Sequence, residues 1–188
     1  FGDGGVAALV ERDEKFGKSY FSLNSDGSRA DLIMIKGGGY RHPSSEETLR
    51  EKVVDEYGNI RSDEQGYMQG GDVFNFVIRE IPRDIKKTLE YVGDTADSFD
   101  YIVFHQANNF INAYIAKKMK LDTDKIPSTI AKYGNTSSVS VPLTIVSELK
   151  DRLYGNKKLL LSAFGVGMTW ATGIVPFVDC KISDIVEV

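Results

Sequence analysis

The sequence predicts an α/β fold in which helices are layered on a mixed β-sheet. Short apolar runs of strand length alternate with longer segments whose apolar residues recur at helical spacing. Their order is strands, a long helix, then strand, helix, loop, helix and two strands. Elements in this order pack as helices on a sheet. The 188 residues are enough for one domain with a substantial core.

Composition and net charge limit the classes of molecule that we expect the protein to bind. The chain is 41% hydrophobic and 27% charged, with a net charge of −4. This balance argues against nucleic acid or an anionic membrane as a general partner. No apolar run approaches the roughly 20 residues that span a bilayer, and the chain does not open on a signal-peptide pattern. The single cysteine, Cys180, rules out an intrachain disulfide and a cysteine metal cluster. We expect a cytoplasmic protein.

The first part of the chain predicts three strands. Residues 6–10 form an apolar run between "GDGG" and a group of charges, which is typical of a short buried strand. Residues 18–25 and 30–36 predict two more strands, with "DGS" as the turn between them.

A loop and two helices are expected next. His42 lies in the loop "GGGYRHPSSEE", where we interpret it as a surface residue without chemistry. Residues 45–58 predict a short polar helix capped by Ser44 or Ser45, and the segment up to residue 71 reads as irregular. Helical spacing over residues 72–92 predicts a long helix that Pro82 kinks or divides.

The second part predicts a strand, two helices and two final strands. "YIVF" at 101–104 is a buried strand with His105 at its C-terminal end. Asn108 or Asn109 caps a helix that runs to residue 119. After the loop "KYGNTSS", Ser138 or Ser140 caps a helix to about residue 153. "KKLLLSAF" and "TWATGIVPFV" are strands joined by "GVGM".

Three features could carry chemistry: His105, the pair Gly134–Asn135, and the glycine-containing turn at 164–167. A neutral imidazole and a carboxamide can both donate hydrogen bonds. Two donors aimed at one oxygen form an oxyanion site, and a glycine turn can add a backbone N–H. Ligand sites in such folds gather at the C-terminal ends of strands, where His105 is expected. Thioester chemistry suits such a site.

Simpler interpretations stay open at this point. A histidine after a strand is often structural, "YGNTS" can be a turn with a helix cap, and "GVG" can be a hairpin turn. Cys180 has no basic neighbour in sequence, which favours an inert thiol. The residues alone therefore predict an α/β domain with a candidate oxyanion-type site.

Five motifs in order add a family resemblance. "FGDGG", "MQGGDVFNFVIRE", "FHQANNFI", "KYGNTSSVSVPL" and "AFGVGMTWA" resemble the C-terminal half of β-ketoacyl-acyl-carrier-protein synthase III, of the thiolase-like superfamily. The resemblance runs from residue 1 to about 178. It implies a thiolase-like half with a mixed five-stranded sheet layered with helices. It also implies that residues 1–188 are one C-terminal domain, and that the N-terminal half with the nucleophilic cysteine lies outside them.

The resemblance implies a decarboxylative Claisen condensation in fatty acid biosynthesis. In that family a Cys–His–Asn triad condenses an acyl-CoA with malonyl-acyl-carrier protein, without a cofactor or metal. By resemblance His105 and Asn135 are catalytic and the N–H of Val166 belongs to the oxyanion hole. Asn108 is then a supporting residue. The positions implied to bind substrate are Gly71, Phe74, Ala107 and Ile111. The implied partners are acyl-CoA, acyl-carrier protein, the N-terminal half and a second copy in a homodimer.

Three positions depart from the family pattern. Cys180 lies beyond the "FGxGxTW" motif and does not match the nucleophile. Phe110 stands where many relatives carry an arginine that helps dock the carrier protein, a task that Lys117 or Lys118 could take over. Val166 replaces a glycine common in the family. Two alternatives therefore stay open: a related synthase of specialised metabolism that uses CoA thioesters, and a non-catalytic thiolase-like binding domain.

Overall fold

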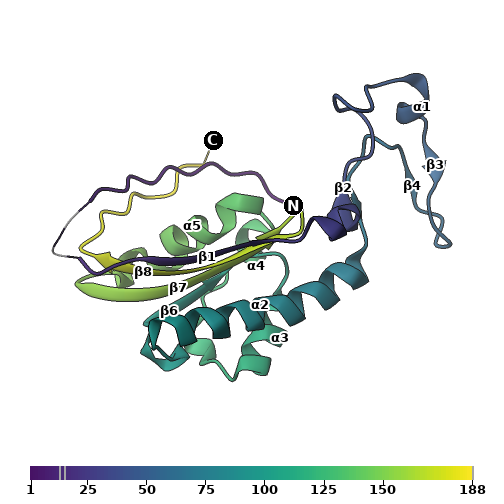
Figure 1. Cartoon of the computed structure of the whole chain (residues 1–188). Coiled ribbons are helices and arrows are strands. Elements are labelled where there is room, and N and C mark those ends of the chain that lie inside the picture. Colours follow the sequence, from purple (N-terminus) through teal and green to yellow (C-terminus); the bar gives the residue numbers. More distant parts are fainter. Residues whose placement is uncertain (13, 15, 188) are drawn as a thin grey trace. The chain divides into compact units, whose positions relative to one another are not determined.

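The computed structural model describes residues 1–12, 14 and 16–187, and its elements are labelled in Figure 1. The strands are β1 (Tyr20–Ser25), β2 (Ile33–Met34), β3 (Lys52–Val53), β4 (Ile60–Arg61), β5 (Tyr67–Met68), β6 (Tyr101–Phe104), β7 (Asn156–Gly165) and β8 (Thr169–Val178). The α-helices are α1 (Glu46–Leu49), α2 (Gly70–Val92), α3 (Asn109–Met119), α4 (Ile130–Tyr133) and α5 (Ser140–Thr144). Short 3-10 turns lie at Gly27–Leu32, Ala96–Ser98, Thr123–Lys125, Ser137–Val139 and Lys150–Arg152.

The chain forms two compact units. The first unit consists of residues 1–24, 77–164 and 170–188, and the second of residues 25–76 and 165–169. Each unit is described by itself below.

A four-stranded sheet is the centre of the first unit, with the strand order β1-β8-β7-β6. β6 pairs in parallel with β7, so that Ile102 lies opposite Leu160 and Phe104 opposite Ser162. β7 and β8 are neighbours joined by a short turn, which only an antiparallel pair allows. The sheet is therefore mixed, as predicted, but it has four strands in the described part of the chain rather than the predicted five.

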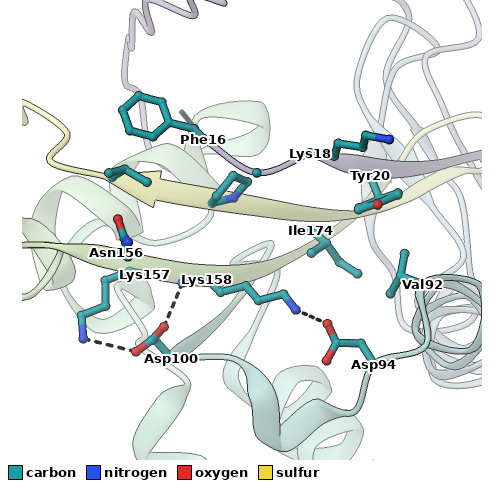
Figure 2. Close-up of a pocket in the computed structure, with 13 residues that line it drawn as sticks. Phe16, Lys18, Tyr20, Val92, Asp94, Asp100, Asn156, Lys157, Lys158 and Ile174 are labelled. Carbon is teal, nitrogen blue, oxygen red and sulfur yellow. Dashed lines mark hydrogen bonds and ion pairs between the residues drawn. The ribbon is translucent and has the colours of Figure 1, made fainter. Parts of the chain in front are cut away.

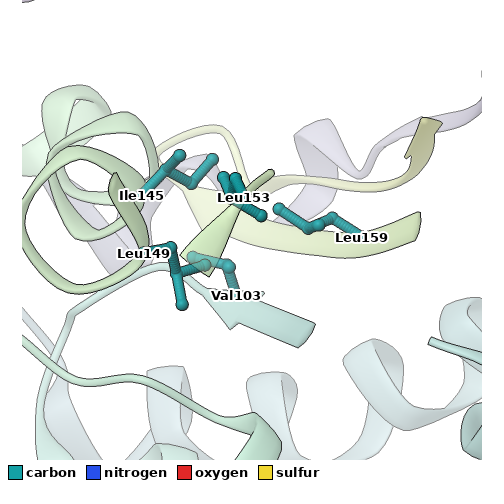
Figure 3. Close-up of a cluster of buried hydrophobic side chains, with 5 residues drawn as sticks. All are labelled: Val103, Ile145, Leu149, Leu153 and Leu159. Carbon is teal, nitrogen blue, oxygen red and sulfur yellow. The ribbon is translucent and has the colours of Figure 1, made fainter. Parts of the chain in front are cut away.

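Helices cover both faces of this sheet (Figure 1). On one face, the segment that follows α5 contributes Ile145, Leu149 and Leu153 to an apolar cluster with Val103 of β6 and Leu159 of β7 (Figure 3). α2 and α3 lie on the other face. The predicted helix from residue 140 to about 153 is present, but it changes winding: Ile145–Leu149 is a π-helix and the last turn is 3-10.

A buried carboxylate joins α2 to two strands of the sheet. Asp84 is only 5% exposed, and it accepts hydrogen bonds from Ser22 Oγ at 2.5 Å, Asn24 Nδ2 at 2.9 Å and Thr172 Oγ1 at 2.6 Å. Ser22 and Asn24 belong to β1 and Thr172 to β8. A carboxylate out of water needs such donors, so these three bonds tie the helix to the sheet.

Pro82 does not divide α2, which is one helix from Gly70 to Val92. A proline lacks an N–H, so the carbonyl of Ile78, one turn earlier, has no donor within the helix. Lys118 of α3 supplies one, because its Nζ lies 2.8 Å from that oxygen. A side chain from the neighbouring helix therefore offsets the missing backbone hydrogen bond.

The second unit is built from short elements. β2 pairs with β5 and β3 with β4, both antiparallel. The strand predicted over residues 30–36 is reduced to β2, because Asp26 starts a 3-10 turn by accepting from the N–H of Ser28 at 3.1 Å. The segment up to residue 71, predicted to be irregular, contains β4 and β5.

The predicted helix over residues 45–58 is reduced to the four residues of α1. Ser45 caps it as predicted, in a capping box with Thr48. After Leu49 the β-branched pair Val53–Val54 and a turn at Gly58 favour the β3–β4 hairpin over a longer helix.

The predicted buried strand at residues 6–10 is wrong. The structure gives this segment no strand, and it leaves Leu9 94% and Val10 90% exposed. An apolar run forms a strand only where another strand pairs with it, and no strand of the described residues does so here. The backbone of this N-terminal segment contacts the rest of the first unit at Gly2, whose N–H donates to the carbonyl of Asn135 at 2.8 Å.

Candidate active site

His105 follows β6 directly, at the C-terminal end of the strand, as predicted. Its backbone N–H donates to the carbonyl of Ser162 at 2.8 Å and so continues the pairing of β6 with β7. Its carbonyl accepts from Asn112 Nδ2 of α3 at 3.1 Å. The backbone of His105 is therefore fixed from the sheet and from the helix.

The imidazole ring of His105 is enclosed. The residue is 9% exposed, and the ring of Phe164 meets it edge to face at a centroid distance of 5.2 Å. Nδ1 lies 2.6 Å from Ser140 Oγ. Burial lowers the pKa of His105 below its ordinary value of 6.5, because removal from water disfavours the charged form. The ring is consequently neutral at neutral pH.

Ser138 or Ser140 was expected to cap this helix, but Val139 stands at the N-cap position of α5 and no side chain makes a capping hydrogen bond there. Ser140 Oγ instead contacts Nδ1 of His105 and accepts from the backbone N–H of Gln106 at 3.2 Å. Sequence reasoning missed this contact, since a serine before a helix fits a cap equally well.

Gln106 is fully buried and holds the loop after β6 in place. Its Nε2 donates to the carbonyl of Phe104 at 2.8 Å, and its Oε1 accepts from the N–H of Thr129 at 3.0 Å and from Ser128 Oγ at 3.1 Å. Both the NH₂ group and the oxygen of the carboxamide make hydrogen bonds, so Gln106 fixes the loop next to His105.

Asn108 begins α3. Its Oδ1 accepts from the N–H of Ile111 at 2.8 Å, which makes Asn108, and not Asn109, the N-cap. This bond fixes the turn between His105 and the helix. Ala107 is half-buried and Ile111 is buried in α3. Their substrate-binding role stays a prediction, as does the supporting role of Asn108.

Asn135 lies in the loop between α4 and the segment that carries Ser140. Its Oδ1 accepts from the N–H of Ser137 at 2.9 Å, which leaves the NH₂ end of the carboxamide to donate. Gly134, with φ at 66°, closes α4 just before it. A positive φ suits glycine, so this residue lets the chain turn sharply ahead of Asn135.

The other predicted site residues belong to the second unit. Val166 is 60% exposed in the turn that joins β7 and β8, and its carbonyl accepts from Thr169 Oγ1 at 2.9 Å. Gly71 and Phe74 lie in the first turns of α2. Their roles in the oxyanion hole and in substrate binding stay predictions.

A cavity of about 470 Å³ lies elsewhere in the first unit (Figure 2). Asp100, Lys157 and Lys158 place it at the N-terminal ends of β6 and β7, away from the strand end that carries His105. Two of the three lysines that line it are paired: Lys157 binds Asp100 at 3.2 Å and Lys158 binds Asp94. Because ligands in such sheets bind at the C-terminal strand ends, the surroundings of His105 remain the better candidate site.

Among the described residues, no helix is long and apolar enough to cross a membrane. These residues contain no group of three or more His, Cys, Asp and Glu side chains placed to hold a metal ion.

Sequence comparison finds relatives along almost the whole chain. Residues 89–177 match the family described as 3-oxoacyl-[acyl-carrier-protein (ACP)] synthase III C terminal. The β-ketoacyl-[acyl-carrier-protein] synthase III of Streptococcus pneumoniae (strain Hungary19A-6) is 34% identical over 179 residues, which cover 93% of this chain and 51% of the relative. The chain thus spans about half the length of the curated relatives it matches.

Solved structures agree with this result. A crystal structure of a 3-oxoacyl-(acyl-carrier-protein) synthase III superposes with a TM-score of 0.81 at 33% identity, over 92% of this chain and 50% of the other. The 3-oxoacyl-(acyl-carrier protein) synthase of Burkholderia xenovorans LB400 gives a TM-score of 0.76 at 35% identity, over 88% and 46%. The predicted thiolase-like α/β fold is confirmed.

Proposed function

Because this chain matches the C-terminal half of the β-ketoacyl-[acyl-carrier-protein] synthase III family, we propose that it supplies His105 and Asn135 to a decarboxylative Claisen condensation. In this proposal the full-length protein condenses an acyl group from acyl-CoA with malonyl-acyl-carrier protein in fatty acid biosynthesis. The N-terminal half would bring the cysteine that holds the acyl group as a thioester. Cytoplasmic location and a homodimer stay predictions.

The state of His105 is the observation that best supports this chemistry. When a malonyl thioester loses carbon dioxide, the electrons of the broken C–C bond move toward the thioester oxygen and form an enolate. The new α-carbon then attacks the acyl thioester, a C–C bond forms and the cysteine thiolate leaves. A neutral, fixed imidazole in a site with little water can donate a hydrogen bond to the enolate oxygen.

Asn135 supplies the matching second donor. Its Oδ1 is occupied by the N–H of Ser137, so rotation of the carboxamide would cost that hydrogen bond. The NH₂ group therefore keeps one direction. Two preoriented donors on one oxygen stabilise developing charge without reorganising during the reaction.

The test is His105→Ala in the full-length protein, followed by separate assays of the two half-reactions. Malonyl decarboxylation should fall by about 10²-fold or more, the range for loss of one oxyanion donor, while acylation of the cysteine continues. Asn135→Ala should act in the same direction. His42, the other histidine, is exposed in the second unit, and His42→Ala is the matched control. Normal decarboxylation in His105→Ala would contradict the assignment.

One observation favours a second candidate, a synthase that takes its extender unit from CoA. Phe110 is 68% exposed on α3, where the resemblance implies a carrier-docking arginine. Lys118 is not a simple replacement for that arginine, because its Nζ is already bound to the carbonyl of Ile78. Turnover of malonyl-CoA against malonyl-acyl-carrier protein by the full-length protein separates the two candidates.

A further inference from the structure

The hydroxyl oxygen of Ser140 lies within hydrogen-bonding distance of two groups. Nδ1 of His105 is 2.6 Å away, and the backbone nitrogen of Gln106 is 3.2 Å away. Ser140 is 1% exposed, so bulk water does not compete for this hydroxyl. The hydrogen bonds of this oxygen are therefore made to groups of the protein.

The possible positions of the protons can be counted. A serine hydroxyl has one proton and two lone pairs. The N–H of Gln106 can only donate, so it occupies one lone pair. Nδ1 of His105 can then accept the serine proton, or it can carry a proton and donate into the second lone pair.

The second arrangement leaves the serine proton without a partner. Among the described residues, His105 and Gln106 are the hydrogen-bond partners of Ser140 Oγ. A buried donor that lacks an acceptor is unfavourable. The first arrangement satisfies every group and leaves Nδ1 unprotonated.

We propose that Ser140 is a positioning residue: its hydroxyl donates to Nδ1 of His105 and thereby fixes the neutral tautomer that carries its proton on Nε2. That tautomer presents an N–H on the side of the ring away from Ser140. The catalytic consequence rests on the function proposed above, in which Nε2–H would donate to the enolate oxygen. The tautomer itself can be measured independently of any activity.

A closed set of buried hydrogen bonds holds Ser140 in place. Its carbonyl accepts from Thr144 Oγ1 at 2.8 Å, and this hydroxyl is 2.8 Å from Thr129 Oγ1. The N–H of Thr129 donates to Gln106 Oε1, and the N–H of Gln106 returns to Ser140 Oγ. All four residues are at most 1% exposed. We call them the polar ring: Gln106, Thr129, Ser140 and Thr144.

The first experiment reads the tautomer in the unsubstituted full-length protein. Histidine labelled with ¹⁵N is incorporated, and long-range ¹H–¹⁵N correlation spectra are recorded at neutral pH. The resonances missing from His105→Gln belong to His105. We expect Nδ1 to give the shift of an unprotonated nitrogen that accepts a hydrogen bond, and Nε2 that of a protonated nitrogen. The reverse pattern would overturn the proposal.

The second experiment compares two buried hydroxyls of the same helix. In Ser140→Ala the Nδ1 resonance should move toward that of an imidazole without a hydrogen-bonded partner. The decarboxylation kcat should fall about tenfold, as for loss of one hydrogen bond, with KM and cysteine acylation little changed. Thr144→Val removes a hydroxyl of the polar ring that does not touch His105. It should lower Tm, and it should shift the His105 nitrogens and lower kcat less than Ser140→Ala does, because the hydroxyl that contacts Nδ1 is kept.

The outcomes separate this proposal from the proposed function. An unmoved Nδ1 resonance in Ser140→Ala, or equal shifts in both variants, would overturn the role of Ser140. The expected tautomer in a protein that does not decarboxylate malonyl thioesters would support the Ser140–His105 bond and count against the proposed reaction. Ser140→Thr, which keeps the hydroxyl, should restore the Nδ1 resonance wherever it folds.

Discussion

The two histidines of the chain differ in their exposure and in their contacts. His42 is in an exposed loop of the second unit. His105 is fixed at its backbone by the sheet and α3, contacts Phe164 at its ring, and has a lowered pKa because it is buried. The same side chain is thus a surface residue in one place and a buried imidazole with a lowered pKa in the other.

The lowered pKa of His105 has a consequence for stability. Below the ordinary value of 6.5 the unfolded chain binds a proton at this position, whereas the folded chain binds it only at lower pH. The unfolded state then holds more protons, so this residue lowers the free energy of unfolding as pH falls through that window. The slope from one such group is at most about 1.4 kcal/mol per pH unit.

His105→Gln removes this titration, so its free energy of unfolding should fall less between about pH 7 and about pH 5.5 than that of the unsubstituted protein. Urea unfolding at the two pH values measures the difference. An identical pH dependence in the two proteins would contradict a depressed pKa at this position.

Local signals predicted the structural positions of some candidate site residues and could not predict the contacts of others. His105 at a strand end and Asn108 as a cap depend on neighbouring residues, and both predictions are confirmed. The contact of Ser140 with His105 joins two segments far apart in the chain. The two residues come together through the pairing of β6 with β7 and the placement of the α5 segment. A pattern of neighbouring residues in the sequence does not predict this tertiary arrangement.

At the scale of elements, the attachment of α2 depends on one buried carboxylate. Asp84 accepts from two residues of β1 and one of β8. Asp84→Ala should lower the free energy of unfolding by about 2 kcal/mol, because three buried or half-buried donors lose their acceptor.

Urea unfolding of the full-length protein measures the effect of Asp84→Ala. Glu90→Ala on the same helix is the control, since Glu90 is exposed and its ion pair with Lys86, at 3.8 Å, is exposed as well; we expect a change of about 0.5 kcal/mol or less. Equal effects of the two substitutions would show that the Asp84 bonds do not stabilise the fold.

Long periodic elements were predictable and short ones were not. α2 and the β7–β8 pair carry enough apolar residues to show their period. α1 and β2 to β5 have two to four residues each, too few for a period. Their conformation depends on caps and pairing partners, such as Ser45 and the β3–β4 hairpin.

At the scale of the molecule, residues 1–188 leave large apolar side chains uncovered. On β1, Phe21 is 64% and Leu23 79% exposed, and in the N-terminal segment Leu9 is 94% exposed. Exposed apolar side chains favour association where they gather into a patch. We therefore expect residues 1–188, produced alone, to self-associate.

Size-exclusion chromatography with light scattering tests this expectation across a range of protein concentrations. Leu23→Ser should reduce the association, whereas Tyr91→Ser, at an exposed position on α2, should not. A monodisperse monomer at every concentration would contradict the prediction.

The order of motifs along the chain predicted the thiolase-like fold, which the comparisons confirm. The same order did not predict the number of strands in the sheet. Residues 6–10 have the composition of a strand, but a strand also needs a neighbour, and composition does not say whether one is present.

The polar ring limits how this sequence can diverge. The hydroxyls of Thr129 and Thr144 pair with each other, and replacing both members of a buried pair by apolar groups of similar shape is nearly neutral, whereas replacing one is not. These two positions should therefore change together during evolution, as hydroxyl with hydroxyl or apolar with apolar. Ser140 has a second partner in His105, so it should persist through such exchanges.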